Sequence, residues 1–120
     1  MSNHKYPFEK LQVWHLAIDL SVLIYRVTKN FPKDERFGLT SQIRRSANSV
    51  SGNLSEGSAR FSNKEKARYF EIAYGSLLET ASHMYLALKL EFLSEEQYNC
   101  IRPPIEELLN KINALHKRLK

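Results

Sequence analysis

The residues of this sequence whose types and spacing could support metal chemistry are two pairs of an acid and a histidine. His15 with Asp19, and Glu79 with His83, lie one helical turn apart and could each supply two ligands. A di-iron helical bundle needs Glu-x-x-His from each of two helices, and this sequence contains no Glu-x-x-His. Pairs at this spacing more often form local hydrogen bonds, so we expect no metal and no other cofactor.

A nucleophile and a phosphate loop are the other chemical possibilities. Cys100 is the single cysteine, which excludes an intrachain disulfide; no histidine is near it in the sequence, and we expect it to serve in packing. Gly52 and Gly57 have the spacing of a phosphate loop, but Ser58 and Ala59 stand where Lys and Ser or Thr are required. The sequence therefore predicts no catalytic residues and no enzyme.

Positive charge is concentrated in one third of the chain. The protein has 120 residues with 18 Lys and Arg against 13 Asp and Glu, a formal net charge of +5. Residues 36–68 contain seven basic and two acidic side chains, an excess equal to that of the whole chain. We expect these residues to form a surface that binds nucleic acid, in which arginines pair with phosphates. The candidate contacts are Arg44, Arg45, Arg60, Lys64, Lys66 and Arg68.

Two aromatic residues and one polar row accompany these basic residues. Phe61 and Tyr69 could stack on unpaired bases if they are exposed, although Tyr69 is expected rather in the core. The polar row predicts either an interhelix hydrogen-bond network, with Glu79 as a partner for Arg45, or a binding surface. Its members are Gln42, Arg45, Ser49, Asn53 and Glu56.

Four helical segments position these groups. Apolar residues recur at spacings of three and four, which predicts helices over about residues 9–30, 39–56, 64–90 and 95–118. No segment alternates with period two as a strand would. The connections are short, which favours antiparallel neighbours. We therefore expect a single domain over residues 1–120, an all-α, antiparallel up-down-up-down four-helix bundle.

The predicted helix ends rest on a few local signals. Gly57 would end the second helix in the left-handed backbone, and Asn63 would cap the third. Ser94 with Gln97 three residues later forms a capping box for the fourth helix. Pro103-Pro104 predicts a kink there, or a short first turn and a restart.

The first predicted helix has a second apolar row beside its core-facing one. This row indicates either a broad core or a contact between subunits, and both interpretations stay open. Its members are Leu11, Trp14, Ile18, Val22 and Tyr25. No apolar run is long enough to span a membrane, and the first ten residues lack a secretory signal pattern, so we expect a cytoplasmic protein.

Several motifs of the first three helices resemble those of a known family. The sequence is similar to the bacterial four-helix bundle proteins named after intervening sequences in 23S ribosomal RNA genes. The resemblance covers the first three predicted helices, and Pro103-Pro104 departs from the family pattern. The matching segments are 8–14 (FEKLQVW), 31–32 (FP), 37–47 (FGLTSQIRRSA), 49–57 (SVSGNLSEG) and 75–79 (GSLLE).

The resemblance implies an antiparallel four-helix bundle that assembles as a homopentamer and is not an enzyme on its own. A related group, the accessory variability determinants of diversity-generating retroelements, assists a reverse transcriptase through a basic surface. Two functions follow as expectations. One is an RNA-binding accessory protein whose subunits multiply the basic surface. The other is a protein-interaction scaffold that docks a separately encoded enzyme such as a reverse transcriptase.

Overall fold

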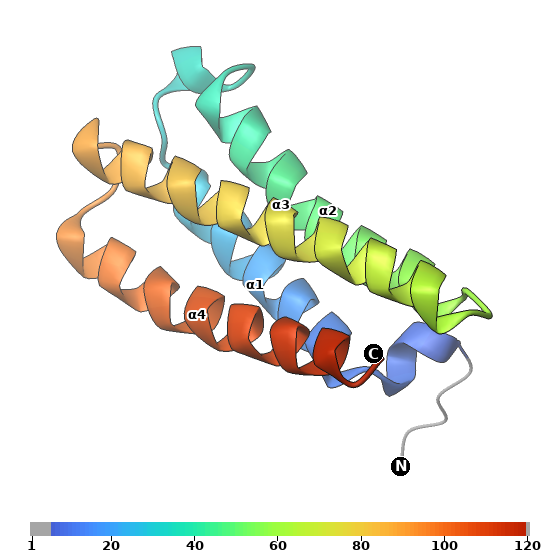
Figure 1. The fold of residues 1–120 in the computed structure, drawn as a ribbon. Coiled ribbons are helices and arrows are strands. Elements are labelled where there is room, and N and C mark those ends of the chain that lie inside the picture. The colour runs from blue at the N-terminus through green and yellow to red at the C-terminus, as the bar shows by residue number, and fades with distance from the viewer. Residues whose placement is uncertain (1–5, 120) are drawn as a thin grey trace.

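Four α-helices and two short 3-10 helices make up the structure, a computed structural model that describes residues 6–119 (Figure 1). Residues 1–5, part of the segment considered for a signal sequence, and residue 120 lie outside the described residues. The described part contains no strand, which confirms the all-α class with four helices. The elements are η1 (Pro7–Lys10), α1 (Gln12–Thr28), η2 (Lys33–Glu35), α2 (Leu39–Ser58), α3 (Asn63–Lys89) and α4 (Glu95–Lys117).

Each helix contacts the next one along the chain, and α4 returns to contact α1. Figure 1 shows α2 and α3 side by side above α1 and α4. Hydrogen bonds between side chains join all four neighbouring pairs. These are Arg44–Thr28, Ser46–Thr80, His116–Glu71 and Lys111–Gln12.

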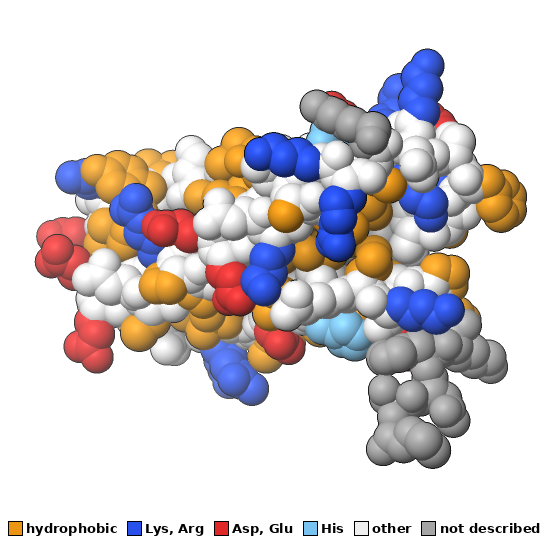
Figure 2. Space-filling view, turned by 60° about the horizontal axis from the view of Figure 1, so that its bottom comes forward, with side chains coloured by type: hydrophobic (Ala, Val, Ile, Leu, Met, Phe, Trp, Pro, Cys, Tyr) orange, Lys and Arg blue, Asp and Glu red, His pale blue; other side chains and the backbone are white. Residues whose placement is uncertain are grey.

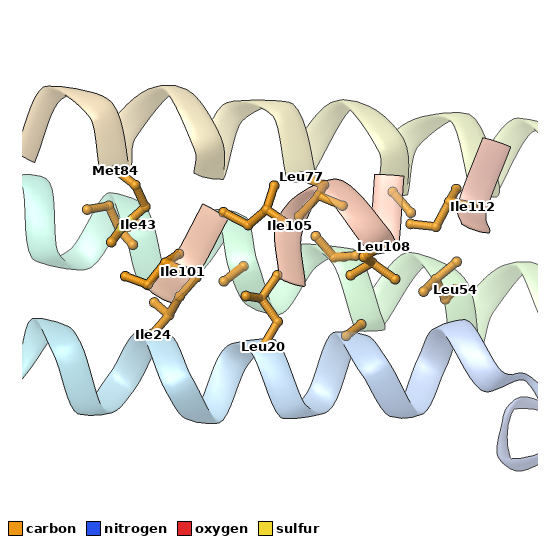
Figure 3. Close-up of a cluster of buried hydrophobic side chains, with 14 of the residues drawn as sticks. Leu20, Ile24, Ile43, Leu54, Leu77, Met84, Ile101, Ile105, Leu108 and Ile112 are labelled. Carbon is orange, nitrogen blue, oxygen red and sulfur yellow. The ribbon is translucent and has the colours of Figure 1, made fainter. Parts of the chain in front are cut away.

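The core lies on the shared axis of the four helices, as Figure 3 shows. Apolar side chains at three- and four-residue spacing on every helix point inward, and burying each large one stabilises the fold by roughly 1.5–3 kcal/mol. The predicted inward rows of α2 and α4 are largely buried as expected. Among the side chains with almost no exposed surface are Ile24, Ile43, Leu54, Leu77, Met84, Ile101, Leu108 and Ile112.

The second apolar row of α1 divides into two parts. Leu11 and Trp14 are half-buried and pack against the core, as the broad-core interpretation requires. Ile18, Val22 and Tyr25 are exposed in the single chain. Only part of the row therefore packs against the core of the single chain. No helix among the described residues is long and apolar enough to cross a membrane.

The first helix begins later than its sequence predicts. Residues 7–10 form the 3-10 helix η1 with Pro7 at its first position, and Leu11 is extended, so α1 starts at Gln12 rather than near Glu9. Its far end also comes earlier, at Thr28 rather than Asn30. The periodicity locates the helix, but local backbone conformation decides its ends.

Gly57 does not end α2 in the left-handed backbone, and that prediction is wrong. It lies inside α2, and no glycine among the described residues has a positive φ. A Cβ added at Gly57 would lie 2.8 Å from Cε1 of Phe70 and 2.9 Å from Cβ of Tyr69. Glycine is needed here because α3 approaches α2 too closely for a side chain.

The cap of α3 is Ser62, and the prediction of Asn63 is off by one residue. The Ser62 hydroxyl accepts a hydrogen bond from the backbone N–H of Glu65 at 3.1 Å. The capping box of α4 is confirmed, with the N–H of Gln97 donating to the Ser94 hydroxyl and the N–H of Ser94 donating to the Gln97 side chain. Serine at these positions satisfies an amide that the first turn leaves free.

Two expectations on α4 are wrong, the restart at the prolines and the packing of Cys100, while a kink at the prolines stays a prediction. The helix runs from Glu95 to Lys117 without a restart, with Pro103 and Pro104 inside it. The two carbonyls deprived of their amide partners belong to Asn99 and Cys100, which are both exposed, so water can solvate them. Cys100 does not pack in the core, because it lies one helical step away from the inward row at Ile101.

Candidate nucleic-acid interface

The structure divides the six basic residues expected in a nucleic-acid interface between two places. Arg44 and Arg45 lie in the first half of α2, whereas Arg60, Lys64, Lys66 and Arg68 follow its end. At 1.5 Å per residue, residues 44 and 58 are about 21 Å apart along the helix axis. On the face shown in Figure 2, Lys and Arg side chains are scattered among hydrophobic, uncharged and acidic ones. The basic segment is therefore not one continuous patch on a single chain.

Arg44 is used to hold α1 against α2. Its Nε donates to the Thr28 hydroxyl at 3.0 Å, and its Nη2 lies 3.4 Å from the carbonyl oxygen of Tyr25. The guanidinium also lies 4.5 Å from the centre of the Tyr25 ring. Tyr25 is in the last turn of α1, where the negative end of the helix dipole attracts a cation. Arg44 thus acts first as a structural residue.

Arg60 is held in the same way at the other end of α2. Its Nη2 donates to the Glu56 carboxylate at 2.8 Å and to the Tyr69 hydroxyl at 3.0 Å, and the guanidinium lies 4.7 Å from the centre of the Tyr69 ring. Tyr69 is half-buried by this contact, so its expected place in the core is wrong. The core position belongs to its neighbour Phe70.

Lys66 also binds to the end of a helix. Its Nζ donates to the backbone carbonyl of Ser58, the last residue of α2, at 3.2 Å. An ammonium at this position complements the negative end of the helix dipole. Three of the six candidates are therefore tied to the chain itself.

The other three candidates are exposed and have no hydrogen-bond or ion-pair partner among residues 6–119. Arg45 stands alone on α2, whereas Lys64 and Arg68 lie one turn apart on α3. Phe61, in the turn before α3, is fully exposed. Phe61, Lys64 and Arg68, called the turn cluster below, offer two cations and an aromatic face to a ligand.

The polar row of α2 resolves into a short interhelix network and an exposed remainder. The Ser49 hydroxyl is hydrogen-bonded to that of Ser76 on α3 at 2.9 Å, and the Asn53 amide donates to Ser49. Within the described chain no ion pair joins Arg45 to Glu79, because both side chains point to solvent. The network interpretation thus describes the middle of the row.

A buried hydroxyl pair accompanies this network and was not expected from the sequence. Ser46 and Thr80, both buried, lie 2.8 Å apart between α2 and α3. The Ser46 hydroxyl also lies 3.0 Å from the carbonyl oxygen of Ile43, and that of Thr80 2.9 Å from the carbonyl oxygen of Ser76. Because each hydroxyl has one proton, one of them donates to the other and the second donates to the carbonyl on its own helix. Small polar residues at helical spacing on both helices were the available signal.

Phe37 is a second exposed aromatic residue that the sequence reasoning did not single out. It is 90% exposed in the connection between α1 and α2, and the guanidinium of Arg36 lies 5.5 Å from the centre of its ring. A phenylalanine beside an arginine in a polar connection was the signal. The chain thus has an exposed phenylalanine near each end of α2.

The acid and histidine pairs do not gather into a metal centre. Across residues 6–119, no group of three His, Cys, Asp or Glu side chains could hold a metal ion. Nε2 of His15 is hydrogen-bonded to the carbonyl oxygen of Glu9 at 2.8 Å. On α4, the hydrogen bond from Arg102 to Glu106 raises the pKa of the guanidinium.

Comparison with known proteins agrees with the motifs of the first three helices. The family model of the 23S rRNA-intervening sequence protein matches residues 9–114. A crystal structure of a protein with unknown function from the S23 ribosomal protein family of Bacteroides thetaiotaomicron VPI-5482 is similar in fold, with a TM-score of 0.78 and 24% sequence identity over 88% of this chain and 98% of that one. No curated protein matches the chain.

Proposed function

The chain belongs to the 23S rRNA-intervening sequence protein family, and on that basis we propose that it is a non-enzymatic, oligomeric RNA-binding accessory protein. The observation that carries this proposal is the turn cluster, where Lys64 and Arg68 have no partner beside the fully exposed ring of Phe61. Cations that contact phosphates, and an aromatic face that stacks on a base, are the elements of single-strand binding. Binding is dominated by the RNA backbone and is independent of sequence.

How strongly salt weakens this binding depends on how many of the six basic residues contact phosphates. Each phosphate neutralised on a single strand contributes about −0.7 to the slope of log K against log salt concentration. If only the three unpartnered cations bind, the slope per subunit is about −2, whereas all six candidates would give about −4. The slope therefore reports which arginines and lysines reach the RNA.

Assembly into a homopentamer is the second part of the proposal. We infer an antiparallel up-down-up-down bundle, supported by contacts in which late residues of one helix meet early residues of the next, such as Thr28, the last residue of α1, with Arg44 in the first half of α2. The exposed Ile18, Val22 and Tyr25 of α1 support a contact between subunits, since apolar side chains of this kind gain free energy when covered. A ring would repeat the turn cluster around its axis and raise avidity.

The test measures binding of a fluorescein-labelled single-stranded RNA by fluorescence anisotropy over a salt series. Lys64→Gln with Arg68→Gln should lower affinity at low salt about tenfold and reduce the slope by about 1.4. Lys117→Gln with Arg118→Gln removes one lysine and one arginine from the exposed end of the described chain and serves as the matched control. The proposal fails if the wild-type protein binds no RNA at low salt, or if both double variants behave alike.

A protein-interaction scaffold is the second candidate, and the exposed apolar residues of α3 favour it. A partner such as a separately encoded reverse transcriptase would cover them. The exposed side chains are Ile72, Leu78, Tyr85, Leu86 and Leu90. Co-purification with a reverse transcriptase that is lost in Leu86→Glu but kept in Lys64→Gln/Arg68→Gln would select this function.

A further inference from the structure

A second basic site lies at the opposite end of α2 from the turn cluster, in the connection between α1 and α2. The chain there encloses a pocket of about 270 Å³. Four of its eight lining residues are basic, and none is acidic. The lining residues of this connection pocket are Thr28, Lys29, Phe31, Pro32, Lys33, Arg36, Thr40 and Arg44.

An unpartnered hydroxyl group lies in the wall of the connection pocket. Thr40 is 7% exposed, and its Oγ1 has no hydrogen-bond partner in the described part of the chain. A buried hydroxyl without a partner costs about 1–3 kcal/mol, so such a group marks a place where a ligand atom would be favourable. Thr28, another residue that lines the pocket, donates to the carbonyl of Ile24 and accepts from Arg44.

The cations of the pocket retain capacity for an anion. Two of the five N–H donors of Arg44 form hydrogen bonds with Thr28 and Tyr25, and these contacts fix the plane of the guanidinium. Lys29 and Lys33 have no hydrogen-bond or ion-pair partner among the described residues, and Arg36 contacts only the ring of Phe37. One fixed guanidinium with three exposed cations suits a small, highly charged anion.

The two neighbouring acidic groups offset only part of the charge of the four basic residues. Asp34 and Glu35 form part of η2, between the pocket residues Lys33 and Arg36. Oε1 of Glu35 accepts the backbone N–H of Leu39 at 3.1 Å and so is turned to the start of α2. Because this amide is taken, the anion site depends on the basic side chains and Thr40 rather than on the helix end.

We propose that the connection pocket binds a phosphate group. The source of this phosphate rests on the proposed function, in which the phosphate belongs to the RNA backbone. A phosphate oxygen would accept the hydrogen bond that Thr40 cannot make within the chain, and Arg36, Arg44 and the two lysines would neutralise its charge. The exposed ring of Phe37 lies beside Arg36 and would stack on the adjoining base.

The first experiment measures the melting temperature of the protein in sodium phosphate and in sodium chloride of equal ionic strength. Phosphate should raise the melting temperature of the wild type, because a ligand that binds only the folded state stabilises it. Thr40→Val keeps the shape of the side chain and removes the unpartnered hydroxyl. This variant should melt higher than the wild type in chloride and lose most of the response to phosphate, whereas Thr40→Ser should keep the response.

The second experiment repeats the RNA titration with Lys33→Gln and Arg36→Gln together. Affinity at low salt should fall about fivefold and the salt slope by about 0.7, the value for one phosphate on a single strand. Lys117→Gln with Arg118→Gln again controls for net charge. RNA binding that the pocket variant leaves unchanged overturns RNA as the source of the phosphate while leaving the proposed function standing.

The two experiments separate the failure of the pocket from the failure of RNA binding. A phosphate response that is equal in the wild type and Thr40→Val, or absent from both, overturns the pocket. A wild-type protein that binds no RNA but responds to phosphate through Thr40 overturns the proposed function and leaves the pocket as a site for free phosphate.

Discussion

Replacing Gly57 by alanine should destabilise the protein, although the same change elsewhere in these helices should stabilise it. Alanine in a helix interior is favoured over glycine by about 1 kcal/mol. At Gly57 the new Cβ would lie 2.8 Å from Phe70 Cε1 and 2.9 Å from Tyr69 Cβ. The Tyr69 Cβ is attached directly to the backbone of α3, so the helices must separate, and overpacking of this kind typically costs 1–3 kcal/mol. We expect a net loss of about 1 kcal/mol.

Gly52 and Gly75 provide matched controls on the same two helices. A Cβ at either position meets no atom within 4 Å. Gly52→Ala and Gly75→Ala should therefore each raise the free energy of unfolding by about 0.5–1 kcal/mol. The difference between these variants and Gly57→Ala, about 2 kcal/mol, is larger than the error of the comparison.

Urea denaturation followed by circular dichroism at one fixed protein concentration measures all three variants. Fixing the concentration keeps any contribution of assembly constant. A rise in the stability of Gly57→Ala equal to that of the two controls would refute the close approach of α2 and α3 at this residue. It would also mean that a close contact between α2 and α3 at Gly57 does not position the turn cluster.

Two further predictions concern the α2–α3 contact and the surface of α1. Thr80→Val removes one partner of a buried hydroxyl pair and should cost about 1 kcal/mol in urea unfolding. Adding Ser46→Ala should then cost less than Ser46→Ala does in the wild type, and strictly additive effects would contradict the pairing. Val22→Asp places a charge in the exposed apolar row of α1 and should convert the proposed homopentamer to monomers in light scattering on a sizing column; an unchanged mass would show that this row is not the contact between subunits.

The core could be predicted from the sequence because burial follows a regular angular step along each helix. Ile43, Val50 and Leu54 on α2 are buried as their spacing indicates. The same regularity explains the error at Cys100, since one residue corresponds to about 100° of rotation and carries the thiol from the core to the surface. Periodicity therefore predicts faces well and neighbouring positions poorly.

The state of each basic residue could not be predicted in the same way. Arg44 is held by a hydroxyl group sixteen residues away, and Lys66 by a carbonyl eight residues away. These partners depend on how two helices cross, and a count of the charges in the sequence contains no information about that crossing. Lys64 and Arg68 differ from Lys66 only in the direction in which they leave α3.

Gly57 illustrates a residue that was recognised as special for the wrong reason. A glycine near a predicted helix end suggests a left-handed residue, but the backbone there stays helical. The actual constraint is the ring of Phe70, thirteen residues along the chain and on another helix. A close approach of this kind becomes visible only once the two helices are placed together.

The adjacent prolines of α4 should make local opening uneven along that helix. Because Pro103 and Pro104 have no N–H to donate to the carbonyls of Asn99 and Cys100, the turns before Pro103 are joined to the rest of α4 by fewer backbone hydrogen bonds. Native-state hydrogen exchange should accordingly show lower protection before the prolines than after them. The single thiol, exposed at Cys100, lies within this segment, so a fluorophore attached there would report its fraying without any engineered cysteine.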